Sequence, residues 1–519
     1  MKKHLLCILM LLTAALTASG EVFYNEDGTF WGFDDEHFLY VVHGNEVTVS
    51  YLGDLYTGVH PDAIEIPATV SCNGLTFTVT TIANSAFYDS YLRSVTIPNT
   101  VSTIEYEAFL NCPNLTNIDI PNSVKHIGRN AFTGTAWYNN QPDGLVYAGQ
   151  VAYQYKGNMP SGTSITLKEG TLAIADNAFY DCNELTNLTI PNSVTHIGDN
   201  ACFSCRYLKN VTIPNSVIYI GNYAFYECTS LELEYLAIPS SATYIGYFSF
   251  YGCHLKSLAI GSSVSEICSG AFAQCYSLTS ITVDSNNLYY DSRDNCNAII
   301  ETSSNTLIAG CKNTIIPNSV TAIGNMAFHG MHHMTSLTIP NSVTHIGNGA
   351  ISTCLGLTSL VIPNSVTFID VNAFRGNDNM RSVTIGNSVT SIGFHAFDYC
   401  RSLRNVTCLA NTPPILNKST AGDPFYFLTF EYGTLYVPNA SIADYKNADQ
   451  WKRFVNIRGI GDLDGDGELN VNDVANLIDE ILAGRVNYED NPAADLNGDG
   501  NIDITDIVDI IDQLLNSSN

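Results

Sequence analysis

The chain has 519 residues, a formal net charge of -28 and only 14% charged residues. From Gly461 onward, fifteen Asp or Glu residues stand against one basic residue, Arg485, so this segment carries about half of the net charge. Acidic surfaces repel nucleic acid and anionic lipid, which excludes both as expected partners, and a concentration of acidic groups favours cations.

Residues 1–20 are predicted to be a secretory signal peptide. Lys2 and Lys3 precede an apolar run from Leu5 to Leu12, and small residues lead up to Glu21. The run is too short to span a bilayer, and no later stretch is long enough. We therefore expect a secreted protein without direct membrane insertion.

Residues 21–62 are predicted to form an N-terminal cap. The segments Phe38-Leu-Tyr-Val-Val and Glu46-Val-Thr-Val-Ser-Tyr alternate between apolar and polar positions, as the two strands of a hairpin do. Such a hairpin would cover the apolar end of a stacked structure that follows it.

Residues 63–410 are organised by one repeated phrase, Ile190-Pro-Asn-Ser-Val. The same five residues return at 120–124, 213–217, 316–320, 339–343 and 362–366. Where copies are consecutive, as at Pro317, Pro340 and Pro363, the step is 23 residues. A fixed period of this length predicts a solenoid of stacked coils.

Each coil is predicted to be mainly extended. Leu188 and Ile190 alternate with polar residues, which indicates a strand with one buried face. Pro191 ends the strand because it has no N–H to donate. Val194 and Ile197 point inward again, and the Ala-Phe-x-x-Cys element that follows in many copies is expected to make a short helical turn.

Eight of the fifteen cysteines share one phase of the repeat. They are expected to be buried thiols, because the parallel side chains of stacked coils disfavour disulfides. Eight cysteines close the Ala-Phe-x-x-Cys element: Cys112, Cys182, Cys205, Cys228, Cys253, Cys275, Cys354 and Cys400. Cys296 and Cys311 lie elsewhere and could pair or stay free.

Two inserts interrupt the period, at 136–162 and 284–312. Each is predicted to contain a hairpin, the first with its turn near Gly149 and the second around Ser304. The first insert is rich in aromatic residues, which could stack on sugar rings or anchor a protein partner. Packing of the hairpin onto the solenoid is an equal alternative. These candidate ligand-binding residues are Trp137, Tyr138, Tyr147, Tyr153 and Tyr155.

Residues 411–460 break the period and are predicted to be a C-terminal cap. Thr434-Leu-Tyr-Val is expected to be a strand, and Ser441 is expected to cap a helix that runs through Tyr445 to Phe454.

Residues 461–519 contain two acidic loops offset by 33 residues, each followed by an apolar-periodic helix, at 474–482 and 507–515. Each loop has oxygen-bearing side chains at positions 1, 3, 5, 9 and 12, and Gly at position 6, where calcium loops turn sharply. Position 7 would contribute a main-chain carbonyl. The pattern predicts two calcium ions. The candidate ligands are Asp462, Asp464, Asp466, Glu468, Asn470 and Asp473 in the first loop, and Asp495, Asn497, Asp499, Asn501, Asp503 and Asp506 in the second.

Two families are similar to these two patterns. The repeat L-x-x-L-x-I-P-x-S-V-x-x-I-G-x-x-A-F-x-x-C resembles the BspA-like leucine-rich repeat of bacterial surface proteins. The paired loops, with Asp at position 12, resemble a type I dockerin. The resemblance implies a β-rich leucine-rich-repeat solenoid with short helical turns, followed by a small all-α calcium-binding dockerin at 461–519.

The dockerin resemblance also implies a cohesin-like partner. In that family, specificity lies largely at loop positions 10 and 11, which are Val471 and Asn472 in the first loop and Ile504 and Thr505 in the second. Only Thr505 is one of the Ser or Thr residues common there.

The sequence supports two hypotheses about function. The first is a secreted, non-enzymatic binding or adhesion protein that recognises host protein or glycan and is held at the bacterial cell surface through a cohesin-like partner. The alternative is an enzyme or accessory subunit of a polysaccharide-degrading complex. No nucleophile-and-base motif, phosphate loop or metalloprotease motif is present, which favours the first.

Overall fold

The repeats form a β-solenoid, and the 23-residue period sets its register. In one coil, β16 (Leu185–Thr189) is followed by a turn and then by β17 (His196–Ile197). Both strands pair in parallel with the next coil, Asn187 opposite Asn210 and His196 opposite Tyr219. Each coil therefore adds one strand to each of two ladders.

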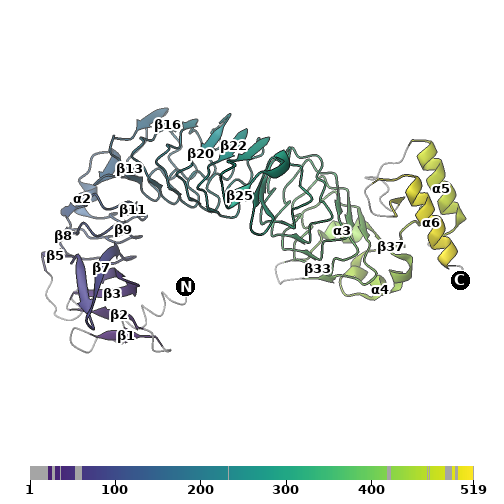
Figure 1. Cartoon of the computed structure of the whole chain (residues 1–519), viewed down its shortest axis with the longest axis horizontal. Coiled ribbons are helices and arrows are strands. Elements are labelled where there is room, and N and C mark those ends of the chain that lie inside the picture. Colours follow the sequence, from purple (N-terminus) through teal and green to yellow (C-terminus); the bar gives the residue numbers. More distant parts are fainter. Residues whose placement is uncertain are drawn as a thin grey trace. The chain divides into compact units, whose positions relative to one another are not determined.

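The structure, a computed structural model, describes residues 21–25, 30–35, 37–52, 61–231, 233–417, 422–464, 466, 468–484, 494–496 and 501–517. The predicted signal peptide lies outside them. The chain divides into two units, Met1–Tyr226 and Glu227–Asn519, each of which is drawn with its coils stacked in chain order (Figure 1). Within the described ranges, none of the helices has the length and apolar character needed to cross a membrane.

The first unit contains four groups of paired strands. They are β1 (Val22–Tyr24), β2 (Phe30–Asp34), β3 (Phe38–His43), β4 (Glu46–Tyr51), β7 (Leu75–Ile82), β9 (Thr103–Ile104) and β11 (His126–Ile127), with β6 (Thr69–Cys72) beside β7; β5 (Ala63–Glu65), β8 (Ser94–Thr96) and β10 (Asn117–Asp119); β12 (Gly144–Ala148), β13 (Val151–Lys156), β15 (Ala173–Ile174), β17 and β19 (Tyr219–Ile220); and β14 (Thr163–Thr166), β16 and β18 (Asn210–Val211).

The second unit continues the same arrangement. Its strands are β20 (Leu236–Ile238), β22 (Ser257–Ile260) and β24 (Ser280–Val283); β21 (Tyr244–Ile245) and β23 (Glu266–Ile267); β25 (Tyr290–Asp291), β26 (Ala298–Glu301), β27 (Thr306–Gly310), β28 (Ala322–Ile323), β29 (His345–Ile346), β31 (Phe368–Ile369), β33 (Ser391–Ile392) and β35 (Ile415–Leu416); and β30 (Ser359–Ile362), β32 (Ser382–Ile385), β34 (Asn405–Cys408), β36 (Thr434–Val437) and β37 (Asn456–Gly459).

In the described residues before the acidic segment, the helices are few and short. They are α2 (Ala136–Asn139), η2 (Arg293–Asn295), α3 (Phe427–Tyr432), η3 (Asn439–Ser441), α4 (Ile442–Asn447) and η4 (Trp451–Arg453). The two longer helices, α5 (Val471–Leu482) and α6 (Ile504–Ser517), belong to the acidic segment.

The repeated phrase has the predicted role, with one addition. Val194 and Ile197 are fully buried, and the Val194 N–H donates to Pro191 O at 3.1 Å to close the turn. The serine also links neighbouring coils, because Ser193 Oγ donates to Thr171 O at 2.8 Å and Ser216 Oγ donates to Val194 O. The serine of the phrase therefore satisfies a carbonyl of the coil before it.

The segment predicted as a short helical turn is a chain of tight turns. Two residues of a coil are left-handed there, as in Asn177 (φ 58°) and Asp181 (φ 55°). The Phe179 N–H donates across to Ala201 O at 2.7 Å. Alternate N–H groups of the segment thus donate to the next coil, and those between them close turns within the segment, as the Tyr180 N–H does to Asn177 O at 3.1 Å.

The described cysteines are thiols outside disulfides, and nearly all are buried, as predicted. Only Cys182 of the eight that share the repeat phase is half-buried. The thiols also act as donors, since Cys354 Sγ donates to Phe328 O at 3.1 Å and Cys400 Sγ to Phe374 O at 3.2 Å. Burial raises the pKa of both thiols to about 12, which keeps the donated proton in place. Cys296 and Cys311 are also free.

The coil between these two cysteines carries Asn377 at the equivalent position. The Asn377 side chain donates to Ile351 O at 2.9 Å and accepts from the Cys354 N–H at 2.7 Å. It is fully buried, so an amide replaces the thiol where one more hydrogen bond can be made.

The predicted hairpins are confirmed. In the N-terminal segment β3 and β4 are antiparallel, and β4 then pairs in parallel with β7, which joins the hairpin to the ladder. In the inserts, β12–β13 and β26–β27 are antiparallel pairs. Each also pairs in parallel with the next coil, through β13–β15 and β27–β28. The inserts are therefore built into the ladder.

The segment after the last clear repeat differs from its prediction. The strand at Thr434 is confirmed as β36, but the helix α4 ends at Asn447, and Ser441 makes no side-chain cap. Ser441 Oγ instead donates to Asn411 O at 2.8 Å. β36 pairs in parallel with β34, and β37 pairs in parallel with β36, so the strand ladder continues to Gly459 although the sequence period has ended.

Candidate calcium-binding and docking site

The two helices of the acidic segment begin inside the predicted loops, earlier than expected. Asn470 is the N-cap of α5, where its side chain accepts from the Asn472 N–H at 2.8 Å. Asp473 completes a capping box, because its Oδ2 accepts from the Asn470 N–H at 2.8 Å. Loop positions 10 to 12 therefore form the first turn of the helix.

The second helix repeats this geometry. The Thr505 N–H donates to Asp503 Oδ1 at 2.8 Å, and the Asp503 N–H donates to Asp506 Oδ2 at 2.8 Å. The hydroxyl of Thr505 also donates to Asp503, and these hydrogen bonds lower the pKa of Asp503. The position-9 carboxylate is therefore held in its charged form.

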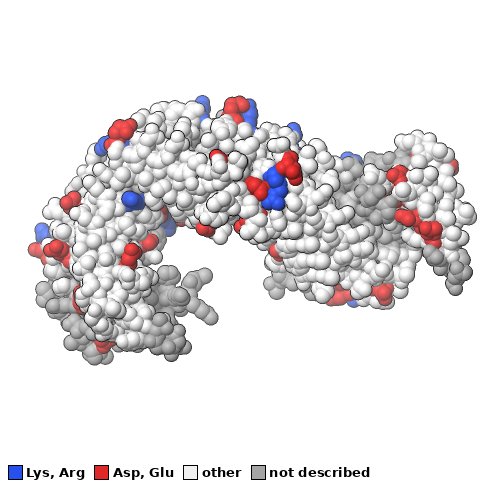
Figure 2. All heavy atoms as spheres, in the orientation of Figure 1, with Lys and Arg blue, Asp and Glu red and all other residues white. Residues whose placement is uncertain are grey.

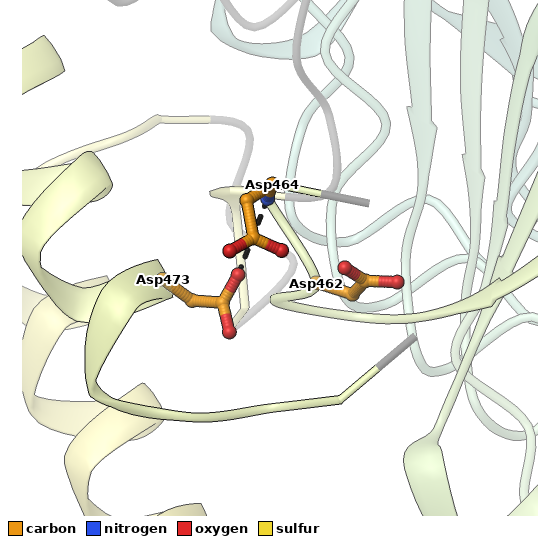
Figure 3. A group of neighbouring side chains, drawn as sticks. All are labelled: Asp462, Asp464 and Asp473. Atoms are coloured by element: carbon orange, nitrogen blue, oxygen red, sulfur yellow. Dashed lines mark hydrogen bonds between the residues drawn. The ribbon is translucent and has the colours of Figure 1, made fainter. Parts of the chain in front are cut away.

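Three carboxylates meet at the first loop. Asp462, Asp464 and Asp473 each offer an oxygen, and these oxygens lie within 4.8 Å of one another (Figure 3). Asp462 and Asp473 are buried, whereas Asp464 is exposed. Backbone N–H groups of Leu463 and Asp464 donate to Asp473 Oδ1 at 2.8 and 3.2 Å. These donors fix the carboxylate beside the other two.

This donor set fits a calcium ion. Buried like charges at this spacing repel each other unless a proton or cation lies among them, and Arg485, the segment's one Lys or Arg, lies outside the described residues. Asp466, Glu468 and Asn470 line the same loop, and the Glu468 N–H donates to Asp466 Oδ1 at 2.8 Å. Bound calcium would neutralise these oxygens and tie the loop to the helix start.

The second loop is partly described and follows the first. Asp495 and Asp506 are buried, and the Leu496 N–H donates to Asp506 Oδ1 at 2.8 Å, as Leu463 does to Asp473. Asn501 and Asp503 are exposed beside them. Asn497 and Asp499, the other two predicted ligands, lie outside the described residues.

An exposed apolar stripe runs along each helix. Val471 is 72% exposed and Ile504 is 71% exposed, which is unusual for residues of this kind. The stripes continue through Ile478 and Leu482 on α5 and through Val508, Ile511 and Leu515 on α6. Asn472 and Thr505 are exposed at their starts. The later stripe residues were not predicted from the sequence, although the 33-residue offset relates Ile478 to Ile511 and Leu482 to Leu515.

The candidate aromatic residues of the first insert pack on the solenoid. Tyr153 is buried, and its hydroxyl accepts from the Phe132 N–H at 3.0 Å. The Trp137 ring lies 5.0 Å from that of Phe132, and the Tyr138 ring lies 5.7 Å from that of Tyr153. For these residues the packing alternative accounts for the structure.

Tyr147 and Tyr155 are also half-buried. The Tyr147 hydroxyl accepts from the Lys168 N–H at 3.0 Å, and the Lys168 ammonium lies 4.2 Å from the centre of the ring. The insert therefore offers no fully exposed aromatic platform among its five candidates.

Two family comparisons match the two parts of the chain. BspA-type leucine-rich-repeat regions match residues 72–154, 149–279, 199–304 and 299–420, which together cover more than half of the chain. The dockerin type I domain matches residues 460–515. No curated protein matches.

Several solved structures are similar. A leucine-rich cell-surface protein from Faecalibacterium prausnitzii is 26% identical, with a TM-score of 0.40, over 75% of this chain and 96% of that one. A leucine-rich-repeat protein from Bacteroides ovatus is 26% identical, with a TM-score of 0.30, over 72% and 94%. The pneumococcal vaccine antigen PcpA is 19% identical, with a TM-score of 0.35, over 82% and 96%.

Proposed function

Because this chain belongs to the BspA-type leucine-rich-repeat family and carries a type I dockerin domain, we propose that it is a secreted binding protein, held at the bacterial cell surface by a cohesin-like partner. Its repeats and its dockerin are modules of protein–protein interaction and complex assembly, and neither is a catalytic domain. Type I dockerins bind calcium in general. We assign two ions here, one to Asp462–Asp473 and one to Asp495–Asp506.

The docking proposal rests on the exposed apolar stripes of α5 and α6. Val471 and Ile504 stand at the same loop position in the two halves, and both are largely exposed directly beside the acidic loops. Calcium that fixes a loop to its helix start would also fix the first residue of the stripe. Docking is therefore expected to depend on calcium, with Asn472 and Thr505 beside the apolar contact.

The docking surface is tested by Val471→Asp combined with Ile504→Asp in the full-length chain. Either stripe could bind the partner in place of the other, so one residue of each stripe must be substituted. We expect at least a hundredfold loss of affinity for immobilised type I cohesins, since burying two uncompensated charges costs about 3 kcal/mol or more. Chelation should abolish wild-type binding.

Ile415→Asp is the matched control, because Ile415 is 67% exposed but lies in the solenoid. It should bind cohesin as the wild type does. If a cohesin that binds the wild type bound the double variant with equal affinity, the assignment of this surface would be contradicted.

We assign recognition of host protein or glycan to the repeats. The face in Figure 2 carries few charged side chains over the repeats, in keeping with the low charged content of the chain. Exposed tyrosine rings, which are enriched at binding surfaces, support the proposal. They include Tyr88, Tyr91, Tyr180 and Tyr207 in the first unit and Tyr235, Tyr247, Tyr289 and Tyr399 in the second.

A panel of mucin glycans, plant and microbial polysaccharides and extracellular-matrix proteins tests this recognition. We expect saturable binding to at least one member and no release of product. Release of oligosaccharide would instead support the alternative of a polysaccharide-degrading enzyme. Absence of both signals would contradict recognition by the repeats while leaving the docking proposal intact.

A further inference from the structure

The solenoid passes into the first calcium loop without a spacer. The Ile460 N–H donates to Val437 O at 2.9 Å, which extends the pairing of β37 with β36 by one residue. The Asp462 N–H then donates to Gly459 O at 3.3 Å. The first predicted calcium ligand therefore lies three residues beyond the end of the last strand.

The small core beneath the two calcium loops includes residues of the solenoid. Its buried members are Ile460, Leu477, Ala494, Leu496 and Ile510. Leu409, which follows β34, and Tyr436, in β36, pack against this core and are half-buried there. A module of two short helices has little apolar surface of its own to bury, so these two side chains are a substantial addition.

Asn439 adds polar contacts at the same junction. Its Nδ2 donates to Ile460 O at 3.1 Å and to Gln513 Oε1 of α6 at 3.3 Å. The backbone of Gly461 lies close to the side chain of Leu469, since a Cβ at Gly461 would lie 2.9 Å from Leu469 Cδ1. Gly461 has a φ of +88°, which a side chain would also strain. The junction therefore has a defined geometry.

We propose that the last strands of the solenoid are a structural part of the calcium-binding module. Leu409, Tyr436 and Asn439 stabilise the folded module, so they favour calcium binding at the first loop. By linkage, calcium at that loop must stabilise β36 and β37 in return. The proposal rests on the proposed calcium function of the loops.

Calcium titration of the full-length chain by calorimetry, in chelator-treated buffer, tests the coupling. Leu409→Ala should bind calcium at the first loop roughly tenfold more weakly, because the apo module is loosened and lost core packing then lowers the apparent affinity. Asn439→Ala, which removes only the two hydrogen bonds, should weaken binding in the same direction. Ile415→Ala, on an exposed residue of β35, should have no effect.

Hydrogen exchange of the same proteins supplies the reciprocal measurement. Calcium should slow the exchange of the Leu435 and Ile457 amides in the wild type, and Leu409→Ala should reduce this protection. Wild-type affinity in both variants, or no effect of calcium on these amides, would overturn the proposal. A wild-type chain that binds no calcium would instead overturn the calcium function itself.

Discussion

Asp473→Asn should shift the calcium-dependent gain of helix in the full-length chain to much higher calcium concentrations, while Glu468→Gln should leave it unchanged. Asp473 is fully buried and accepts from the backbone N–H groups of Leu463, Asp464 and Asn470. An amide offers one acceptor oxygen and would turn its NH₂ toward one set of these donors. The loop would lose a charged calcium ligand and the link to its helix start together.

The two substitutions are matched in charge and lie in one loop. Glu468 is exposed and stands at position 7, where the main-chain carbonyl is the expected ligand, so its side chain contributes little. Losing a ligand and its hydrogen bonds costs about 3 kcal/mol, or roughly a hundredfold in calcium affinity.

Far-ultraviolet circular dichroism during a calcium titration, followed by chelation, measures the effect. α5 and α6 are the longest helices of the described chain, so their folding dominates the helix signal. Equal calcium dependence in the Asp473 and Glu468 variants would show that the carboxylate cluster is not the calcium site.

The regular part of the fold could be predicted from the sequence because the residues that produce it recur at a fixed period. Pro191 and Val194 recur at 23 residues, and a repeat of that length has one way to bury its apolar positions. The role of Ser193 was not predictable, since its hydroxyl donates to Thr171 in another coil and a turn residue gives no sign of such a partner. The presence of Asn377 where other coils have cysteine was missed for the same reason, because its side chain also bonds to the preceding coil.

The continuation of the ladder through β36 and β37 was hidden because the step from β34 to β36, Asn405 to Thr434, lengthens to 29 residues, which destroys the period but not the pairing. In the acidic segment the candidate calcium ligands were proposed from their spacing. The stripes were missed because the apolar period of each helix does not by itself distinguish a buried face from an exposed one. The contacts of Leu409 and Tyr436 join residues distant in sequence, which no local pattern reveals.

The stack of phenylalanine rings is the feature that joins the last repeats to the C-terminal segment. Phe397 is fully buried, with ring centroids 5.0 Å from Phe374 on one side and 5.0 Å from Phe425 on the other. Phe425 lies beyond the end of the sequence period and packs against Trp451 and Phe454. Phe397 therefore links the periodic stack to this aromatic cluster.

Phe397→Ala should destabilise the C-terminal end of the solenoid by about 3–5 kcal/mol, because neighbouring rings cannot close the gap without breaking the strand register. In a solenoid each coil is held by its neighbours alone, so the loss also uncouples the aromatic cluster from the repeats. Urea unfolding followed by the fluorescence of Trp451, with Trp31 and Trp137 replaced by Phe in every protein, isolates this region. Phe427→Ala makes the same chemical change at a residue that is 56% exposed and should cost less than about 1 kcal/mol. Equal losses in the two variants would mean that the ring stack does not hold the last coils together.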